Sequence, residues 1–220
     1  MFKYILFDLD GTLTDPKEGI TKCVTYALSQ FGIEEDPNNL THFIGPPLIE
    51  SFEKYYNFNH IQAEEAVEFY RERFDKVGKF ENRVLSGVPQ MLEKLKEQDR
   101  VLAISSSKPE VFVKQILEKY EIDKYFEEVV GSTMDSSRAQ KADIIAETFD
   151  RLDIRDDEKD SVIMVGDRLH DIVGAHKCGI KCIGVRFGYA KEGELEEYKA
   201  DYICDTVKEL EEMLLKKNPD

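Results

Sequence analysis

The chain lacks several features that would point to a membrane, a metal-thiolate site or a nucleic acid. No stretch approaches the roughly eighteen consecutive apolar residues of a membrane-spanning helix. None of the four cysteines forms a C-x-x-C pair, which disfavours a zinc site, and we expect small, reduced core residues instead. Acidic residues outnumber basic ones by 45 to 30, and the resulting net charge of −15 disfavours binding to nucleic acid or to an anionic membrane.

The N-terminus also lacks the basic, then apolar, then small-residue pattern of a secretory signal, so we expect a cytoplasmic protein. Its 220 residues are enough for one or two domains with a sizeable core. A hydrophobic content of 41% with 34% charged residues is typical of a soluble globular protein. In so acidic a chain an anionic substrate needs a locally positive site, which a metal, a lysine or a helix N-terminus can supply.

Strand and helix patterns alternate over most of the chain. Residues 4–7 are consecutively apolar, which is typical of a strand buried on both faces. Further strand patterns at 101–104, 129–131, 162–165 and 181–185 alternate with helical patterns at 88–96, 110–120, 141–149, 169–177 and 207–215. This alternation predicts an α/β fold with a doubly wound, Rossmann-like parallel sheet.

Residues 16–83 interrupt that pattern with helices and no convincing strand. Helical patterns cover 18–31, 48–56 and 62–77. We therefore expect a core of residues 1–15 and 84–220 and an inserted all-helical cap of residues 16–83. Because the insertion follows the first strand directly, we expect it to lie over a pocket at the end of that strand as a lid that excludes water.

The motif Asp8-Leu9-Asp10-Gly11-Thr12 follows the first strand. Ligands of open α/β sheets bind outside the carboxyl ends of the strands. Residues two apart in an extended chain point the same way, so Asp8 and Asp10 are candidates for one pocket. Two carboxylates so close repel each other unless a cation or a shared proton intervenes, which predicts a divalent metal. The alternative is that Asp10-Gly11 is only a turn, but no alternating strand follows it.

Two other strand ends carry polar groups. Ser105-Ser106-Ser107 precedes a helix, where hydroxyl and N–H groups can bind phosphate or simply cap the helix. Asp167 follows the strand at 162–165, and Asp171 lies one helical turn later on the same face. Such oxygen ligands suit Mg²⁺. Alternatively, Asp167 caps the helix and Asp171 pairs with Arg168 or Lys177.

Lys141 opens a helix, where a cation opposes the helix dipole. A lysine at a helix start is normally a solvated surface residue. Its unfavourable placement is a mild indication that it serves a phosphoryl oxygen or a nearby carboxylate. Lys108 competes with Lys141 for this role.

With these motifs in this order, the chain resembles the haloacid dehalogenase-like hydrolases over essentially its whole length, and among them the phosphoglycolate-phosphatase-like branch with a helical cap. The resemblance implies that Asp8 is a nucleophile that becomes an aspartyl-phosphate and that Asp10 is the general acid and base. It implies that Thr12 supports the loop, that Ser106, placed by Ser107, binds phosphate, and that Lys141 screens the charge on Asp8 and on the phosphoryl group. It implies Mg²⁺ as cofactor, with a set of possible ligands: Asp8, Asp10, Asp167 and Asp171.

The function expected from this resemblance is Mg²⁺-dependent hydrolysis of small phosphorylated metabolites by a monomer or homodimer. Phosphoglycolate, nucleoside monophosphates and sugar phosphates all remain open as substrates. The choice between Ser105 and Ser106 is open as well. The turn at Gly45-Pro46-Pro47 is as compatible with a helix corner as with substrate contact, and surface roles are favoured for Lys17 and Arg71.

Three other functions compete with this one. A phosphomutase would use the same aspartyl-phosphate, and no sequence feature separates it from a hydrolase. A dehalogenase is disfavoured, because that chemistry needs neither the metal nor the later carboxylates. A receiver-like phospho-accepting signalling module is disfavoured by length, by the helical insertion and by the acceptor's position after the first strand.

Overall fold

The computed structural model describes residues 2–135 and 137–216. The chain splits into two compact units, Met1–Thr14 with Val84–Asp220 and Asp15–Arg83. The strands β2 (Thr14–Asp15) and β3 (Arg83–Val84) form a separate two-stranded sheet where the chain passes between the units. Among the residues described, no helix has the length and apolar character needed to cross a membrane.

The first unit is built on a six-stranded sheet in the order β5-β4-β1-β6-β7-β8, and each neighbouring pair is parallel. Its strands are β1 (Tyr4–Phe7), β4 (Val101–Pro109), β5 (Glu128–Ser132), β6 (Val162–Gly166), β7 (Lys181–Val185) and β8 (Tyr202–Cys204). The chain runs outward from β1 to β5, then returns to β6 and runs outward to β8. Strand order therefore reverses beside β1, where open α/β sheets bind their ligands.

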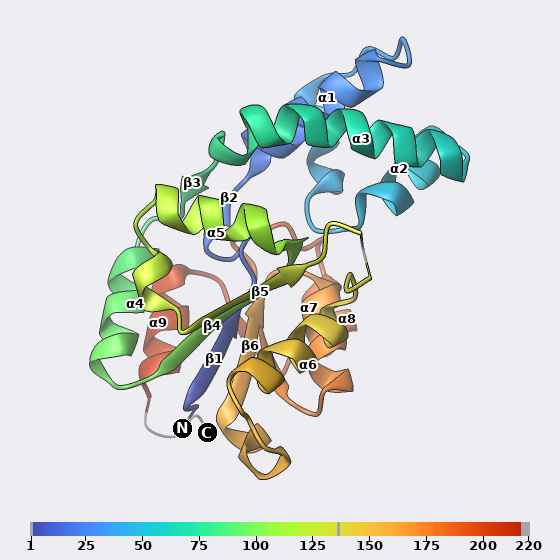
Figure 1. Ribbon diagram of the computed structural model, residues 1–220. Helices are drawn as coiled ribbons and strands as arrows, with labels where there is room; N and C mark the ends of the chain where they lie inside the picture. The colour runs from blue at the N-terminus through green and yellow to red at the C-terminus, as the bar shows by residue number, and fades with distance from the viewer. Residues whose placement is uncertain (1, 136, 217–220) are drawn as a thin grey trace. The chain divides into compact units, whose positions relative to one another are not determined.

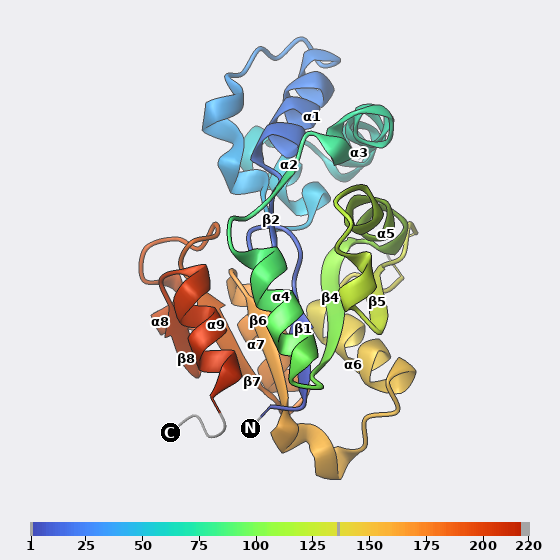
Figure 2. The same ribbon diagram turned by 90° about the vertical axis from the view of Figure 1, so that its left-hand side faces the viewer.

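Helices cover both faces of this sheet, as Figures 1 and 2 show. One face carries α4 (Val88–Glu97), α5 (Glu110–Lys119) and α9 (Val207–Leu215), and the other carries α6 (Lys141–Arg151), α7 (Leu169–Lys177) and the short α8 (Glu194–Glu197). Successive side chains of a strand point to opposite faces, so Ile5 and Phe7 enter the first core while Tyr4 and Leu6 enter the second. Short 3₁₀ helices, η3 (Asp123–Tyr125) and η4 (Asp156–Ser161), lie in the connections.

The second unit is helical. It contains α1 (Lys17–Ser29), η1 (Pro37–Phe43), α2 (Leu48–Tyr56), α3 (His60–Lys76) and η2 (Gly78–Phe80). A capping box between Asn59 and Gln62 begins α3. The helix α1 lies so close to the segment after α3 that a Cβ on Gly19 would lie 2.1 Å from the carbonyl oxygen of Gly78.

The predicted α/β class and the doubly wound parallel sheet are confirmed. The sequence reading missed β8 and α8, which are short and lack a long apolar run. It was also wrong to end the strand that begins at Val101 at residue 104. The strand β4 continues to Pro109, because a register shift between Ser106 and Pro109 lets it keep pairing with β5.

Candidate active site

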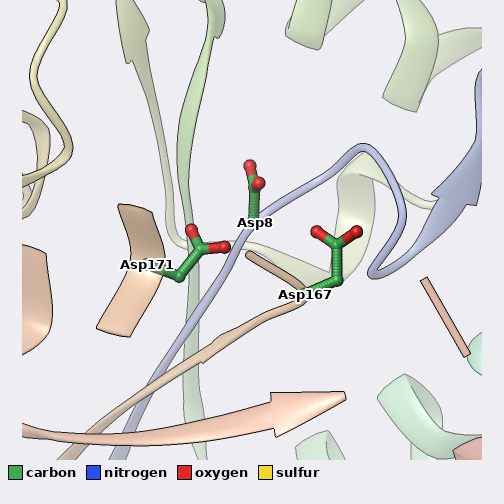
Figure 3. Close-up of side chains that lie close together, drawn as sticks. All are labelled: Asp8, Asp167 and Asp171. Atoms are coloured by element: carbon green, nitrogen blue, oxygen red, sulfur yellow. The ribbon is translucent and has the colours of Figure 1, made fainter. Parts of the chain in front are cut away.

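Three carboxylates meet at the carboxyl edge of the parallel sheet (Figure 3). Asp8 follows β1, Asp167 follows β6, and Asp171 lies in the first turn of α7. One carboxylate oxygen of each lies within 4.8 Å of the others. The backbone N–H of Asp8 donates to the carbonyl of Val165 (2.9 Å), so the ladder between β1 and β6 sets these strand ends side by side.

Only one of the two carboxylate oxygens of Asp167 is hydrogen-bonded among the described residues. Its Oδ2 accepts a hydrogen bond from the backbone N–H of Tyr189 (2.7 Å), and its side chain is buried. Its Oδ1 is also buried and has no hydrogen-bond partner in the part of the chain that the structure describes. A buried carboxylate oxygen without a donor is unusual in a native fold, and this carboxylate lies beside two other acidic groups, Asp8 and Asp171.

Glycines make room for these carboxylates. A Cβ on Gly11, whose φ is +81°, would lie 2.2 Å from Asp167 Oδ2, and a Cβ on Gly188 would lie 2.5 Å from the same atom. A Cβ on Gly166 would lie 2.1 Å from Asp171 Cγ. All three positions therefore require the smallest residue, and at Gly11 the positive φ requires it as well.

Lys141, the first residue of α6, is the cation of this cluster. Its Nζ lies 2.7 Å from Asp171 Oδ1 and 3.2 Å from Asp8 Oδ1, and it donates to the carbonyl of Ser105 (2.8 Å). The side chain is 4% exposed, which excludes the solvated surface role. Burial alone would lower the pKa of Lys141, but Asp171 and Asp8 outweigh it and raise that pKa.

Asp10 lies outside this group of three. Its Oδ2 pairs with Lys108 Nζ at 2.6 Å, while its Oδ1 is buried without a hydrogen-bond partner among the described residues. The argument from an extended chain does not apply here, because β1 ends at Phe7 and the motif turns back at once. The backbone N–H groups of Leu13 and Thr14 donate to the carbonyl of Leu9 in that turn.

The other predicted phosphate-site residues are close in sequence to these groups. Thr12 is fully buried, and its hydroxyl has no hydrogen-bond partner among the residues described. Ser105 points to the α6 face, where its hydroxyl pairs with that of Thr148 (2.7 Å). Ser106 lies on the opposite side of β4 and accepts a hydrogen bond from the Lys108 N–H (3.3 Å), while Ser107 is half-buried. The geometry therefore favours Ser106 over Ser105 as the available hydroxyl.

The electrostatics of the three carboxylates fit a bound Mg²⁺. Burial, Asp171 and Asp8 raise the pKa of Asp167 well above its ordinary value. Burial also raises the pKa of Asp171, although Lys141 opposes that rise. A divalent cation bound by oxygen ligands would relieve this repulsion and give Asp167 Oδ1 a partner.

The sequence reading missed two structural supports of the site. Arg168 and Glu194 form a buried ion pair (Nε to Oε1, 2.9 Å), and Glu194 also accepts from the N–H of Leu169 (2.9 Å). This ties the loop after β6 to α8. The second support is the turn at Gly188-Tyr189, where the Tyr189 N–H donates to Asp167 Oδ2. The sequence signal for this turn is Gly188, a glycine shortly after the end of β7.

Comparison with known proteins shows the family of this chain. The family model described as "Haloacid dehalogenase-like hydrolase" matches residues 5–185. A 5'-nucleotidase from Pseudomonas aeruginosa is 42% identical over 211 residues, which cover 96% of this chain and 94% of that protein. The tyrosine-protein kinase PtkA of Mycobacterium tuberculosis is 32% identical over 213 residues, covering 96% of this chain and 72% of that protein.

Among solved structures, a predicted phosphatase from Clostridium acetobutylicum superposes with a TM-score of 0.93 at 44% identity. The match covers 98% of this chain and 99% of that one. The resemblance stated from the sequence is thus confirmed by a family match, by relatives and by the fold. The chain belongs to the haloacid dehalogenase-like hydrolases and is one of their phosphatases.

Proposed function

We propose that this protein is a Mg²⁺-dependent phosphatase that hydrolyses monoesters of small phosphorylated metabolites through an aspartyl-phosphate on Asp8. The observation that carries the proposal is the buried cluster of Asp8, Asp167 and Asp171, with Lys141 between two of them. It lies where strand order reverses at the carboxyl edge of the sheet. An anionic nucleophile, a fixed cation and metal-binding oxygens in one place suit attack on a phosphate.

We assign a residue to each chemical step. An oxygen of Asp8 forms a bond to phosphorus while the ester P–O bond breaks, and Asp10 gives its proton to the departing oxygen. Asp10 then takes a proton from water, whose oxygen bonds to the phosphorus of the aspartyl-phosphate while the bond between phosphorus and the Asp8 oxygen breaks, which releases inorganic phosphate and restores the Asp8 carboxylate. Lys141 stays beside the Asp8 carboxylate and offsets its charge throughout.

Asp8, Asp167 and Asp171 would hold the metal ion. Bound Mg²⁺ supplies positive charge that lowers the repulsion between the nucleophile and the phosphate dianion. The wider ligand set that includes Asp10 stays a prediction, as do the phosphate contacts of Ser106 and Ser107 and the loop-supporting role of Thr12.

Nucleoside 5'-monophosphates are the first substrates to test, because the 42% identical relative is named a 5'-nucleotidase. Phosphate release from nucleoside monophosphates, phosphoglycolate and sugar phosphates should be measured with Mg²⁺ and with a chelator. We expect turnover of at least one ester only when Mg²⁺ is present. Equal rates in the chelator would contradict the metal requirement. Conversion of a sugar phosphate to its isomer without phosphate release would indicate a mutase.

Replacing the nucleophile tests the covalent step. Asp8→Asn should abolish phosphate release, because the amide cannot form the aspartyl-phosphate. Asp160→Asn is the matched control, since Asp160 is exposed and lies outside the cluster. Substantial turnover by Asp8→Asn alongside a normal control would rule out Asp8 as the nucleophile.

For residues 16–83 we propose a lid. Its first residues follow Asp10 closely in the chain, and two short strands form both connections to the other unit. Two narrow connections of this kind permit hinge motion of one unit against another. Small-angle X-ray scattering should show a smaller radius of gyration when Mg²⁺ and beryllium fluoride, a phosphoryl mimic, are added together. An unchanged radius would contradict closure.

A further inference from the structure

A buried lysine that the proposed mechanism does not use lies against Asp10. The distance from Lys108 Nζ to Asp10 Oδ2 is 2.6 Å, and the two side chains are 7% and 12% exposed. The second carboxylate oxygen, Oδ1, makes no hydrogen bond within the described residues. Asp10 therefore has one oxygen, Oδ2, paired with an ammonium group, and one buried oxygen, Oδ1, without a hydrogen-bond partner among the described residues.

An irregularity in β4 brings Lys108 to this place. The register between β4 and β5 shifts between Ser106 and Pro109, and the Lys108 N–H turns back to the hydroxyl of Ser106 (3.3 Å). Bulges of this kind redirect side chains next to active sites. The neighbouring strand accommodates the bulge with Gly131, where a Cβ would lie 2.5 Å from the carbonyl oxygen of Lys108. The register shift in β4 and the glycine in β5 together permit the observed position of Lys108.

We propose that Lys108 is a positioning residue for Asp10 in the first half of the reaction. Its ammonium group fixes Oδ2, which leaves Oδ1 directed to the leaving oxygen. It also stabilises the carboxylate that forms on Asp10 when the proton passes from Oδ1 to that oxygen and the ester P–O bond breaks. The inference rests on the proposed function and adds to it the residue that positions Asp10 for protonating the leaving alcohol.

This role predicts a dependence on the leaving group. An alcohol departs poorly as an alkoxide and needs the proton of Asp10. A nitrophenol departs as a stable phenolate and needs no proton. Loss of Lys108 should therefore affect an alkyl monoester far more than an aryl monoester, whereas loss of a phosphate-binding lysine would affect both equally.

The test compares kcat/KM of Lys108→Met on p-nitrophenyl phosphate and on the alkyl monoester that the wild-type protein hydrolyses best in the substrate screen, with nucleoside 5'-monophosphates tried first. This parameter reports the steps up to release of the alcohol, so hydrolysis of the aspartyl-phosphate does not enter it. We expect a fall of about 100-fold on the alkyl ester, the scale of a general-acid contribution, and only a few-fold on the aryl ester. Since both values come from one protein sample, their ratio does not depend on the folded fraction. Lys108→Gln gives the same ratio if Lys108→Met does not fold.

Two further variants complete the design. Asp10→Asn should show the same selective loss, and the double variant should lose no more than either single variant. Lys114→Met is the matched control, because Lys114 is an exposed lysine on α5 paired with Glu110.

Equal losses on the two esters, or no loss, would overturn the role of Lys108 while leaving the proposed function intact. Failure of the wild-type protein to hydrolyse p-nitrophenyl phosphate and every alkyl monoester of the substrate screen would overturn the proposed function, and the inference with it.

Discussion

Four glycines surround the acidic cluster and Lys141, and each lies where a methyl group would collide with a functional side chain. Gly11, Gly166 and Gly188 lie against Asp167 or Asp171, and a Cβ on Gly174 would lie 2.6 Å from Lys141 Cγ. Close packing of this kind fixes a carboxylate that has only one of its oxygens hydrogen-bonded to a backbone N–H, as in Asp167 and Asp171. The second oxygen of Asp167 has no hydrogen-bond donor among the described residues and remains available to a metal ion.

Gly188→Ala should weaken Mg²⁺ binding. The new methyl group would lie 2.4 Å from Asp167 Cβ and 2.5 Å from Gly11 O, so the carboxylate must move. Loss of a group that orients a metal ligand typically costs about 10- to 100-fold in affinity. Isothermal titration calorimetry of Mg²⁺ with the wild-type protein and the variant measures the change directly.

The control for this substitution is Gly184→Ala, whose methyl group would have the side chains of Leu195 and Ala200 as its nearest neighbours, at 3.0 Å or more. It should leave Mg²⁺ affinity unchanged while lowering stability slightly. Normal affinity in Gly188→Ala would show that Asp167 does not bind the metal.

At the scale of elements, one buried ion pair connects the loop after β6 to α8. Arg168 and Glu194 are 6% and 5% exposed, and the Glu194 carboxylate also accepts from the N–H of Leu169. Burial opposes ionisation of Glu194, but the Arg168 side chain and the Leu169 N–H outweigh it and lower its pKa. The pair thereby fixes the start of α7, on which Asp171 lies.

Glu194→Ala should lower the free energy of unfolding by about 3 kcal/mol, because it leaves a buried guanidinium without its carboxylate. Urea unfolding followed by circular dichroism gives the value. Glu196 lies on the same helix as Glu194, and its exposed ion pair is with Arg186, which follows β7. Glu196→Ala should therefore change the free energy of unfolding little. Similar results for the two variants would show that burial of the Arg168 pair contributes nothing.

The second unit contains a pH-dependent contact between α3 and the segment after η2. Arg73 donates to both carboxylate oxygens of Glu81 (2.6 and 3.1 Å), and Lys22 lies 3.1 Å from the same group. The Arg73 hydrogen bonds lower the pKa of Glu81 from its ordinary value of 4.5. A depressed pKa means that this stabilisation is present above 4.5 and is lost as pH falls through the folded-state value.

Glu81→Gln should therefore lower the free energy of unfolding by about 1–2 kcal/mol at neutral pH, the scale of charge-assisted hydrogen bonds. The difference from wild type should disappear in acid, where Glu81 itself is neutral. Urea unfolding across this pH range measures it. Glu72→Gln, in an exposed pair with Lys76, serves as the control and should show little effect. A difference that persists in acid would indicate lost packing instead of lost charge.

At the scale of the whole molecule, a net charge of −15 opposes the approach of an anionic substrate. Raising the salt concentration from about 10 to about 100 mM shortens the Debye length from roughly 30 to 10 Å and weakens that repulsion. With Mg²⁺ saturating, kcat/KM for a phosphate monoester should rise about two- to threefold. Steady-state kinetics across this range provide the measurement, with kcat as the internal control. A fall in kcat/KM would mean that the lysines at the site dominate the field that the substrate meets.

Much of the fold and part of the candidate site were predictable from the sequence, because they depend on local order along the chain. Apolar runs alternating with helical patterns determined a parallel sheet covered on both faces. The polar residues that follow Phe7 and Gly166, the last residues of β1 and β6, had to meet at one edge, since the carboxyl ends of parallel strands lie together. The meeting of Asp8 with Asp167 follows from that rule, and the place of Asp171 follows from its position one helical turn after Asp167, in the first turn of α7.

Tertiary structure alone decided the contacts that depend on packing between distant segments. The pairing of Lys108 with Asp10 requires a bulge that no periodicity announces. The hydrogen bond from the Tyr189 N–H to Asp167 depends on a turn whose path is set by the close approach of Gly11 and Gly188. The order of residues along the chain determines which side chains reach the carboxyl edge of the sheet. The interaction partner of each of these side chains depends on distances that only the folded chain determines.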